Sequence, residues 1–264
     1  MKERVVLAKK NILEMILAEK KKELREKKNN PRSFKELLNN KEFVLLAEIK
    51  KASPTKGVIV EKFDPERQLN SYISAGVDAV SILTDEKFFQ GSTALFRELR
   101  KKTELPLLRK DFVIDSLQVY ESFFIGADII LLISTILSKE KLKSLLDITH
   151  SLGMEALVEV HNRNDLDKAV CSGAEIIGVN NRNLNDFTID LGNTEKILSL
   201  LKEKRNRDNY KIISESGISS REDIEFLGEI GVDGVLMGSS LMTAADPEQK
   251  IKDLFLDRRQ FYAD

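Results

Sequence analysis

The sequence predicts a (β/α)8 (TIM) barrel of the α/β class over residues 43–264, preceded by a helical extension over residues 1–42. The first observation is a repeated joint in which a glycine, a small or apolar residue and an acid lead into an apolar run. The glycine suits the left-handed end of a helix, and the run reads as a buried strand. Five copies of this joint indicate a repeated βα unit. They begin at Gly76, Gly126, Gly153, Gly173 and Gly231.

The spacing of the apolar runs is the second observation. Eight runs lie roughly 20 to 35 residues apart, which leaves room for the helix that each parallel crossover requires. Eight strands and eight helices in about 220 residues form a closed barrel. The alternative, an open doubly wound sheet, usually has fewer strands and an early Gly-rich phosphate fingerprint, which this chain lacks. The runs centre near Leu46, Ser81, Leu108, Leu131, Leu157, Ile177, Ile213 and Leu236.

The composition limits the classes of partner and site that we expect. The 42 Lys+Arg and 43 Asp+Glu residues nearly cancel, which argues against a nucleic-acid or membrane partner. One cysteine and two histidines make a His/Cys metal site improbable, although carboxylates alone could hold magnesium; we expect no metal. The N-terminus is too charged for a signal peptide, and no apolar run approaches the roughly 20 residues that span a bilayer. We therefore expect a soluble, cytoplasmic protein, working as a monomer.

The extension over residues 1–42 contains two predicted helices. The stretch from Val5 to Lys28 is charged and amphipathic, and Ser33 with Glu36 forms a capping box that begins the second helix. The basic residues of the first helix alternate with acids, which favours a solvated face over a nucleic-acid surface. We expect the extension to pack on the barrel.

The first predicted strand leads into charged residues. Glu48 and Lys50 lie two apart and project from one face of the strand that begins at Phe43. A carboxylate and an ammonium there are costly to bury unless they are paired or used, and a surface ion pair is the alternative. A polar turn over residues 53–57 follows and lets backbone approach a ligand.

Helix starts along the chain agree with the barrel. Asp64 and Asp246 each precede a proline, which pairs an N-cap acid with proline at the first helical position. Ser219 and Glu222 form a capping box before the last strand.

Polar and aromatic residues follow the strands at the carboxyl ends, the active face of such barrels. Each has another interpretation: Lys110 and Glu159 could be a structural ion pair, the asparagines a turn, and the phenylalanines packing residues. His161 beside Glu159 could act as a base, but we favour a rim histidine with a structural or neutral role. Because distant segments supply these side chains to one rim, we favour a shared site. Its members are Glu48, Lys50 and Ser53; Phe88 and Phe89; Lys110, Asp111 and Phe112; Glu159; residues 180–183; residues 214–217; and residues 238–240.

The last two loops predict an anion site. Ser216-Gly217-Ile218 and Gly238-Ser239-Ser240 each precede a helical stretch, where small residues expose backbone N–H groups. A phosphate held there would place Lys110 and Glu159 near the middle of a sugar-like substrate. We expect a lysine pKa lowered by neighbouring cations and a glutamate pKa raised by an apolar rim, which suits acid–base chemistry. A Schiff-base aldolase would use the same lysine differently.

The ordered motifs resemble the indole-3-glycerol phosphate synthase family, from the N-terminal helix to the end of the barrel. Thr55 and Phe88 depart from the serine and tyrosine common there. A different phosphosugar barrel enzyme, such as phosphoribosylanthranilate isomerase, and a non-catalytic phosphometabolite-binding protein remain the competing hypotheses. The motifs are Glu48-x-Lys50-x-x-Ser53-Pro54-Thr55-x-Gly57, Leu108-Arg109-Lys110-Asp111-Phe112, Leu157-Val158-Glu159-Val160, Ile177 to Leu184, Ser214 to Ile218 and Gly238 to Met242.

The resemblance implies ring closure of 1-(2-carboxyphenylamino)-1-deoxyribulose 5-phosphate to indole-3-glycerol phosphate in tryptophan biosynthesis, without a cofactor. It implies Lys110 as general acid and Glu159 as general base, with Lys50 contacting the substrate carboxylate or assisting proton transfer and Glu48 stabilising positive charge. Implied substrate contacts are Ser53, Asn180, Arg182, Glu215 and Ser216; the apolar slot is Phe89, Phe112, Leu131 and Leu184; and Gly217, Gly238 and Ser239 contact phosphate.

Overall fold

The computed structural model describes residues 31–55, 57–183, 186–204 and 207–255 of the chain. The predicted helix from Val5 to Lys28 lies outside the described residues, so the extension over residues 1–42 is described only from Pro31 onward. Within the described ranges, no helix is long and apolar enough to cross a membrane.

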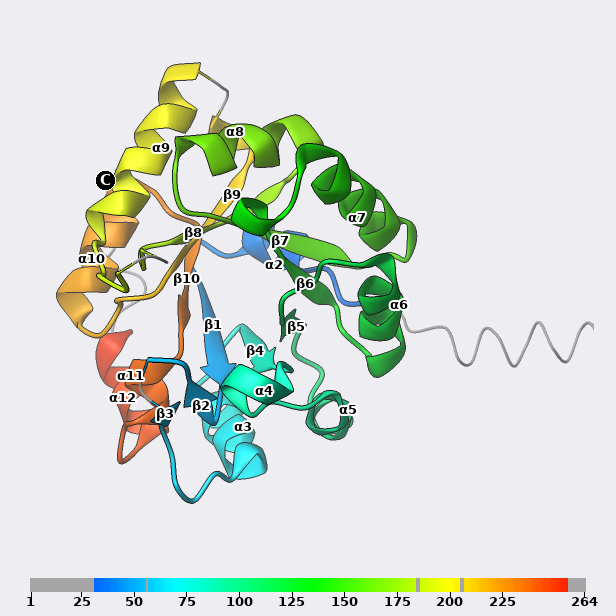
Figure 1. Cartoon of the computed structure of the whole chain (residues 1–264). Coiled ribbons are helices and arrows are strands. Elements are labelled where there is room, and N and C mark those ends of the chain that lie inside the picture. The colour runs from blue at the N-terminus through cyan, green and yellow to red at the C-terminus, as the bar shows by residue number, and fades with distance from the viewer. Residues whose placement is uncertain (1–30, 56, 184–185, 205–206, 256–264) are drawn as a thin grey trace, which may run out of the picture. The chain divides into compact units, whose positions relative to one another are not determined.

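Eight parallel strands close into a barrel in which β1 pairs with both β4 and β10 (Figure 1). The predicted (β/α)8 barrel is confirmed, and each predicted strand centre lies within a strand. The strands are β1 (Val44–Ile49), β4 (Ala79–Leu83), β5 (Leu107–Lys110), β6 (Ile129–Ile133), β7 (Glu155–Val160), β8 (Ile176–Asn180), β9 (Lys211–Glu215) and β10 (Gly234–Met237). A short hairpin, β2 (Ala52–Ser53) with β3 (Gly57–Val58), follows β1.

Helices surround the barrel on its outside (Figure 1). The crossover helices place their apolar faces on the strands, as the βα repeat predicts. The helices are α2 (Phe34–Asn40), α3 (Pro65–Ser74), α4 (Glu86–Phe89), α5 (Thr93–Arg100), α6 (Ser116–Ile125), α7 (Lys139–Ser151), α8 (Arg163–Ser172), α9 (Gly192–Lys204), α10 (Arg221–Ile230), α11 (Ser239–Met242) and α12 (Pro247–Leu254), with 3-10 turns η1 (Ser134–Ile136) and η2 (Arg207–Asn209).

Side-chain caps begin the helices largely where the sequence predicts. The carboxylates of Asp64 and Asp246 cap α3 and α12, each followed by a proline. The capping box predicted at Ser219 and Glu222 is wrong by one residue. Ser220 is the N-cap of α10, because Asp223 reaches back to accept hydrogen bonds from the Ser219 and Ser220 N–H groups.

The acids of the repeated joint connect neighbouring strands at the amino ends of the barrel. All five joint glycines have a positive φ, between 76° and 93°, as a left-handed helix end requires. Asp78, which precedes β4, accepts the N–H of Leu45 in β1 at 2.8 Å. Asp128 and Asp233 do the same for Leu107 in β5 and Ile212 in β9, also at 2.8 Å. Each of these acids therefore fixes the start of an adjacent strand.

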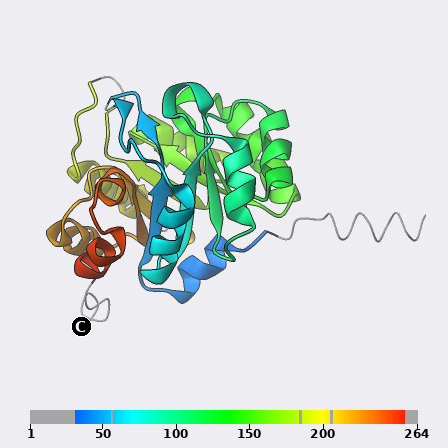
Figure 2. The ribbon, with the colours of Figure 1, turned by 90° about the horizontal axis from the view of Figure 1, so that it is seen from below.

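Two apolar layers make up the core. Alternate strand residues face the barrel interior, where Leu46, Leu108 and Leu157 pack together, while the intervening residues pack against the outer helices. Phe34 and Leu38 of α2 join the interior layer. Figure 2 shows α2, in blue, at one end of the barrel and the β2–β3 hairpin at the other. The amino end is thus closed by α2, and the carboxyl end is left for a site.

Candidate active site

The alternation of strand residues places charged side chains at the carboxyl mouth of the barrel. Glu48, Lys110 and Glu159 each lie two residues beyond a leucine of the interior layer, so they face the same interior. The carboxylates of Glu48 and Glu159 are only 3% and 4% exposed. Buried charges of this kind need partners, and the mouth supplies them.

A five-residue charge cluster fills the mouth. The Nζ atom of Lys110 lies 2.8 Å from Glu215 Oε2 and 3.5 Å from Glu159 Oε2. The Nζ atom of Lys50 lies 2.6 Å from Glu48 Oε1, which confirms that the two side chains project together. Three buried carboxylates therefore share two lysines. The sequence suggested Glu159 as the ion-pair partner of Lys110, whereas Glu215 is the nearer carboxylate.

The cluster shifts the pKa values of Lys110 and Glu159 in opposite directions. Burial alone would lower the pKa of Lys110, but the charges of Glu215, Glu159 and Glu48 outweigh it and raise that pKa. Burial would raise the pKa of Glu159, but Lys110 and a hydrogen bond from His161 hold it below its ordinary range. Both shifts are opposite to those expected from the sequence, because the neighbours of the lysine are carboxylates and those of the glutamate are donors.

Glu215 is the carboxyl group whose pKa is raised. Burial is the largest cause, and the charges of Glu159 and Glu48 add to it against the opposing charge of Lys110. Its Oε1 atom is buried without a hydrogen-bond partner among the described residues. A side chain at Gly178 would bring a Cβ within 2.1 Å of that oxygen, so the glycine makes the room that Glu215 occupies.

Polar side chains continue from Glu159 toward the β8–α9 segment. The Nε2 atom of His161 lies 2.9 Å from Glu159 Oε1, and its Nδ1 atom lies 3.2 Å from the carbonyl oxygen of Arg182. The side-chain oxygen of Asn180 accepts the N–H of Arg182 at 3.0 Å. His161, Asn180 and Arg182 border a cavity of about 420 Å³, lined also by Thr135, Asn162, Asn181, Asn183, Thr188, Asp190 and Asn193.

A second hollow of about 430 Å³ lies outside the barrel, at α3 and the start of α12. Asp64, Glu66, Arg67 and Glu248 are among its lining residues. Its lining includes none of the predicted site residues, so we place the candidate active site at the carboxyl mouth of the barrel.

The two loops predicted to bind an anion lie together beside the cluster. Ser216 and Gly217 both have a left-handed backbone, with φ of 69° and 89°, which turns the chain sharply after β9. The Ser240 hydroxyl donates to the carbonyl oxygen of Ile218 at 3.0 Å and joins this loop to the one after β10. At Gly238, a Cβ would lie 2.3 Å from Glu48 Oε1, so this loop approaches the cluster closely.

The apolar residues predicted for the substrate slot are partly brought together. The rings of Phe89 and Phe112 are in contact, with centroids 6.2 Å apart and planes inclined at 41°. Leu131 is 3% exposed and belongs to the barrel's interior layer. Ser53 lies in the β2–β3 hairpin, paired with Gly57. Leu184 lies outside the described residues.

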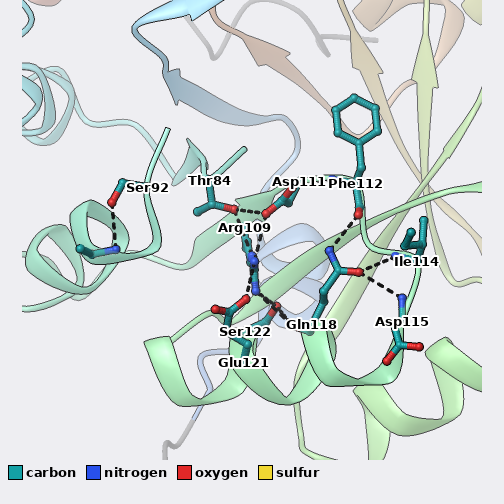
Figure 3. Close-up of polar contacts among 11 residues, drawn as sticks. Thr84, Ser92, Arg109, Asp111, Phe112, Ile114, Asp115, Gln118, Glu121 and Ser122 are labelled. Carbon is teal, nitrogen blue, oxygen red and sulfur yellow. Dashed lines mark hydrogen bonds and ion pairs between the residues drawn. The ribbon is translucent and has the colours of Figure 1, made fainter. Parts of the chain in front are cut away.

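Arg109 anchors the loop that carries Phe112, a role the sequence analysis did not assign (Figure 3). Because Lys110 faces the interior, Arg109 faces outward toward α6. Arg109 is 3% exposed. Its guanidinium contacts five groups at 2.7–3.1 Å: the Thr84 hydroxyl, the Gln118 carbonyl, the Ser122 hydroxyl and the carboxylates of Asp111 and Glu121.

The side chain of Gln118 completes this anchor. Its amide nitrogen donates to the Phe112 carbonyl at 2.9 Å, and its oxygen accepts the N–H groups of Ile114 and Asp115. The alternation of β5 could have indicated an outward Arg109. Its partners, however, come from the residue after β4, the loop after β5 and α6, and could not be read from the sequence.

Comparisons with known proteins agree with the geometry. Residues 2–254 match the family model described as indole-3-glycerol phosphate synthase. A relative of that name from Petrotoga mobilis is 50% identical over 247 residues, covering 94% of this chain and 98% of the relative. Another from Acetivibrio thermocellus is 46% identical over 217 residues, covering 82% of each. In fold alone, the chain is similar to 3-hexulose-6-phosphate synthase from Salmonella typhimurium, with a TM-score of 0.63 and 17% identity. The match covers 81% of this chain and 99% of that protein.

Proposed function

The chain belongs to the indole-3-glycerol phosphate synthase family, and we propose that Lys110 and Glu159 are the acid and the base with which it closes the indole ring. The enzyme is a carboxy-lyase of tryptophan biosynthesis. It converts 1-(2-carboxyphenylamino)-1-deoxyribulose 5-phosphate to indole-3-glycerol phosphate with loss of CO2 and water. The observation that supports the assignment is the contact of Lys110 with the buried carboxylates of Glu159 and Glu215.

Lys110 acts in the first step. As the ring carbon that bears the carboxylate attacks the ketone carbon, the ketone oxygen gains negative charge and takes a proton from the Lys110 ammonium. The new carbon–carbon bond then allows CO2 to leave, and its electron pair restores the aromatic ring. The raised pKa of Lys110 supports this role, because the ammonium is present at neutral pH.

Glu159 acts in the later dehydration. Its carboxylate removes a proton from the ring-closed intermediate while the hydroxyl group leaves as water, with a proton returned by an ammonium of the cluster. The lowered pKa of Glu159 supports a carboxylate that is ionised and ready to accept. Lys50 contacts the substrate carboxylate or assists proton transfer, and Glu48, paired with it, stabilises developing positive charge.

Binding groups surround this centre. The backbone of Gly217, Gly238 and Ser239 holds the phosphate, and Ser216 and Glu215 hold the sugar chain. Ser53, Asn180 and Arg182 bind the polar edge of the substrate. The anthranilate ring lies in an apolar slot of Phe89, Phe112, Leu131 and Leu184, and the ring contact between the two phenylalanines supports the first part of that slot. We further propose that the enzyme works as a cytoplasmic monomer.

A Schiff-base aldolase is disfavoured as an alternative. That chemistry needs a neutral lysine amine as nucleophile, which enzymes obtain by lowering the lysine pKa. The carboxylates around Lys110 instead raise its pKa and keep the amine protonated.

Turnover of the carboxyphenylamino substrate, followed by indole fluorescence, tests the proposal. The chain has no tryptophan, so the product signal is free of protein background. Lys110→Met and Glu159→Gln should each lower kcat by roughly 10²- to 10⁴-fold. Lys143→Met is the matched control, because Lys143 forms an exposed ion pair with Asp147 on α7 and should turn over normally. Near-normal kcat in both site variants would refute the roles, and a well-folded wild-type protein without turnover would refute the function.

A further inference from the structure

His161 lies one residue after β7 and bridges the proposed base to the neighbouring strand segment. Its Nε2 atom is 2.9 Å from Glu159 Oε1, and its Nδ1 atom is 3.2 Å from the carbonyl oxygen of Arg182. Its backbone N–H donates to Asp165 Oδ2 at 3.3 Å. The side chain is 10% exposed, so its ring is held from both sides.

These two contacts determine how many protons His161 and Glu159 must share. A carbonyl oxygen only accepts hydrogen bonds, so Nδ1 must carry a hydrogen toward Arg182. A neutral imidazole would then present the lone pair of Nε2 to a carboxylate oxygen, and the two lone pairs would repel at 2.9 Å. The pair is stable only with one more proton, either on Nε2 of His161 or on Glu159.

We propose that His161 is a positioning residue for the base, holding one proton between its Nε2 atom and Glu159 Oε1. With Oε1 so occupied, the proton taken from substrate goes to Oε2, the oxygen that lies 3.5 Å from Lys110. The substrate C–H bond breaks and its proton goes to Oε2. The C–H electron pair forms the new double bond, and the hydroxyl leaves as water with a proton returned by an ammonium of the cluster. The inference rests on the proposed role of Glu159.

The charged groups around the pair decide where the proton resides. Lys110 pairs with Oε2 of Glu159, and the Asp165 carboxylate faces His161 from α8. Arg182 and Asp190 line the same cavity. Burial lowers the pKa of His161, but the bond and charge of Glu159, the Arg182 carbonyl and Asp165 together raise it above its ordinary value. These neighbours favour the proton on the imidazole side of the pair.

The pH dependence follows with a definite sign. A histidine with a raised pKa keeps its Nε2 proton to higher pH than a free histidine does, so the Glu159 bond is present below the raised pKa and is lost as the pH rises through it. Loss of that proton sets two lone pairs against each other and displaces the base. The wild-type kcat should therefore fall on an alkaline limb that reports His161.

Two substitutions distinguish the contributions of the two ring nitrogens of His161. Glutamine places its amide nitrogen near the position of Nε2, so His161→Gln keeps a donor to Glu159 that does not titrate. Asparagine places its amide nitrogen near the position of Nδ1, so His161→Asn keeps the Arg182 contact and loses the Glu159 contact. We expect His161→Asn to lower kcat roughly 10- to 100-fold with little change in KM, whereas His161→Gln retains more kcat and loses the alkaline limb.

A measurement independent of turnover completes the test. The chain has two histidines, so 15N-histidine NMR has to distinguish His161 only from the exposed His150 on α7. Glu159→Gln should lower the midpoint at which His161 titrates. His150→Gln, which should turn over normally, assigns the signals. A His161 midpoint that Glu159→Gln leaves unchanged, or identical pH profiles of kcat in wild type, His161→Asn and His161→Gln, would overturn the inference. Absence of wild-type turnover would instead overturn the proposed function, since the NMR titration does not need it.

Discussion

Replacing Lys110 with methionine should destabilise the protein in a pH-dependent way as well as stop turnover. Lys110 pairs with Glu215 at 2.8 Å and with Glu159 at 3.5 Å, and Lys50 is already paired with Glu48. Methionine fills much of the same space without charge, so the change isolates the electrostatic part. Three buried carboxylates would then share one lysine.

The distances set the magnitude. At an effective dielectric constant of about 20, the contacts of 2.8 and 3.5 Å correspond to gross attractions of about 6 and 5 kcal/mol. Desolvation of the lysine and the carboxylates offsets most of this attraction. Removing one partner of a buried pair usually costs about 3–5 kcal/mol, which is the loss in the free energy of unfolding that we expect at pH 8.

The loss should shrink at lower pH. The pKa of Glu215 is already raised and rises further without Lys110. A carboxyl group whose folded pKa is raised contributes stability below its unfolded pKa and loses it as the pH rises through the folded pKa. The variant should therefore be closer to wild type at pH 6 than at pH 8.

Urea unfolding followed by far-UV circular dichroism, at pH 6 and pH 8, measures both effects. Adding Glu215→Gln to Lys110→Met removes the unpaired carboxylate and should restore part of the lost stability at pH 8. Lys143→Met serves as the exposed control. A Lys110→Met protein as stable as wild type at both pH values, with no gain from Glu215→Gln, would refute the described charge coupling.

Three further substitutions test other parts of the molecule. Arg109→Met should lower the free energy of unfolding, measured by urea unfolding, by about 3 kcal/mol. Arg109→Lys should recover little of that loss, because an ammonium cannot reach five acceptors. Full stability in Arg109→Lys would contradict this. Asp128→Asn should cost about 1–3 kcal/mol by the same measurement while kcat stays near wild type, since it acts at the amino ends of the strands. Gly178→Ala should lower kcat at least about tenfold, because its Cβ collides with Glu215 Oε1; unchanged kcat would show that the carboxylate can move aside freely.

Strand periodicity and the repeated joint were sufficient to predict the barrel, since both are local properties of the chain. They also predicted that Glu48 and Lys50 share a face. The partner of Lys110 could not be predicted in this way, because Glu215 comes from β9 and their contact depends on how strands lean across the mouth. The sequence therefore assigned the wrong signs to the pKa shifts of Lys110 and Glu159.

Smaller errors have equally physical causes. Both Ser219 and Ser220 are capable N-caps, and the choice between them was decided by the reach of the Asp223 carboxylate. The anchor at Arg109 was missed because its acceptors come from the residue after β4, the loop after β5 and α6, which only the folded chain brings together.

The pairing of β1 with β10 has a consequence for biosynthesis. Val44 pairs with Gly234, so about 190 residues separate the two strands in the chain. At roughly 5–20 residues per second, a ribosome needs on the order of 10–40 s to deliver the second after the first. During that interval β1 can pair with β4 on one side only, and its other edge is open to other nascent chains. Chaperone demand in the cell should therefore depend on how quickly the residues between Val44 and Gly234 are translated.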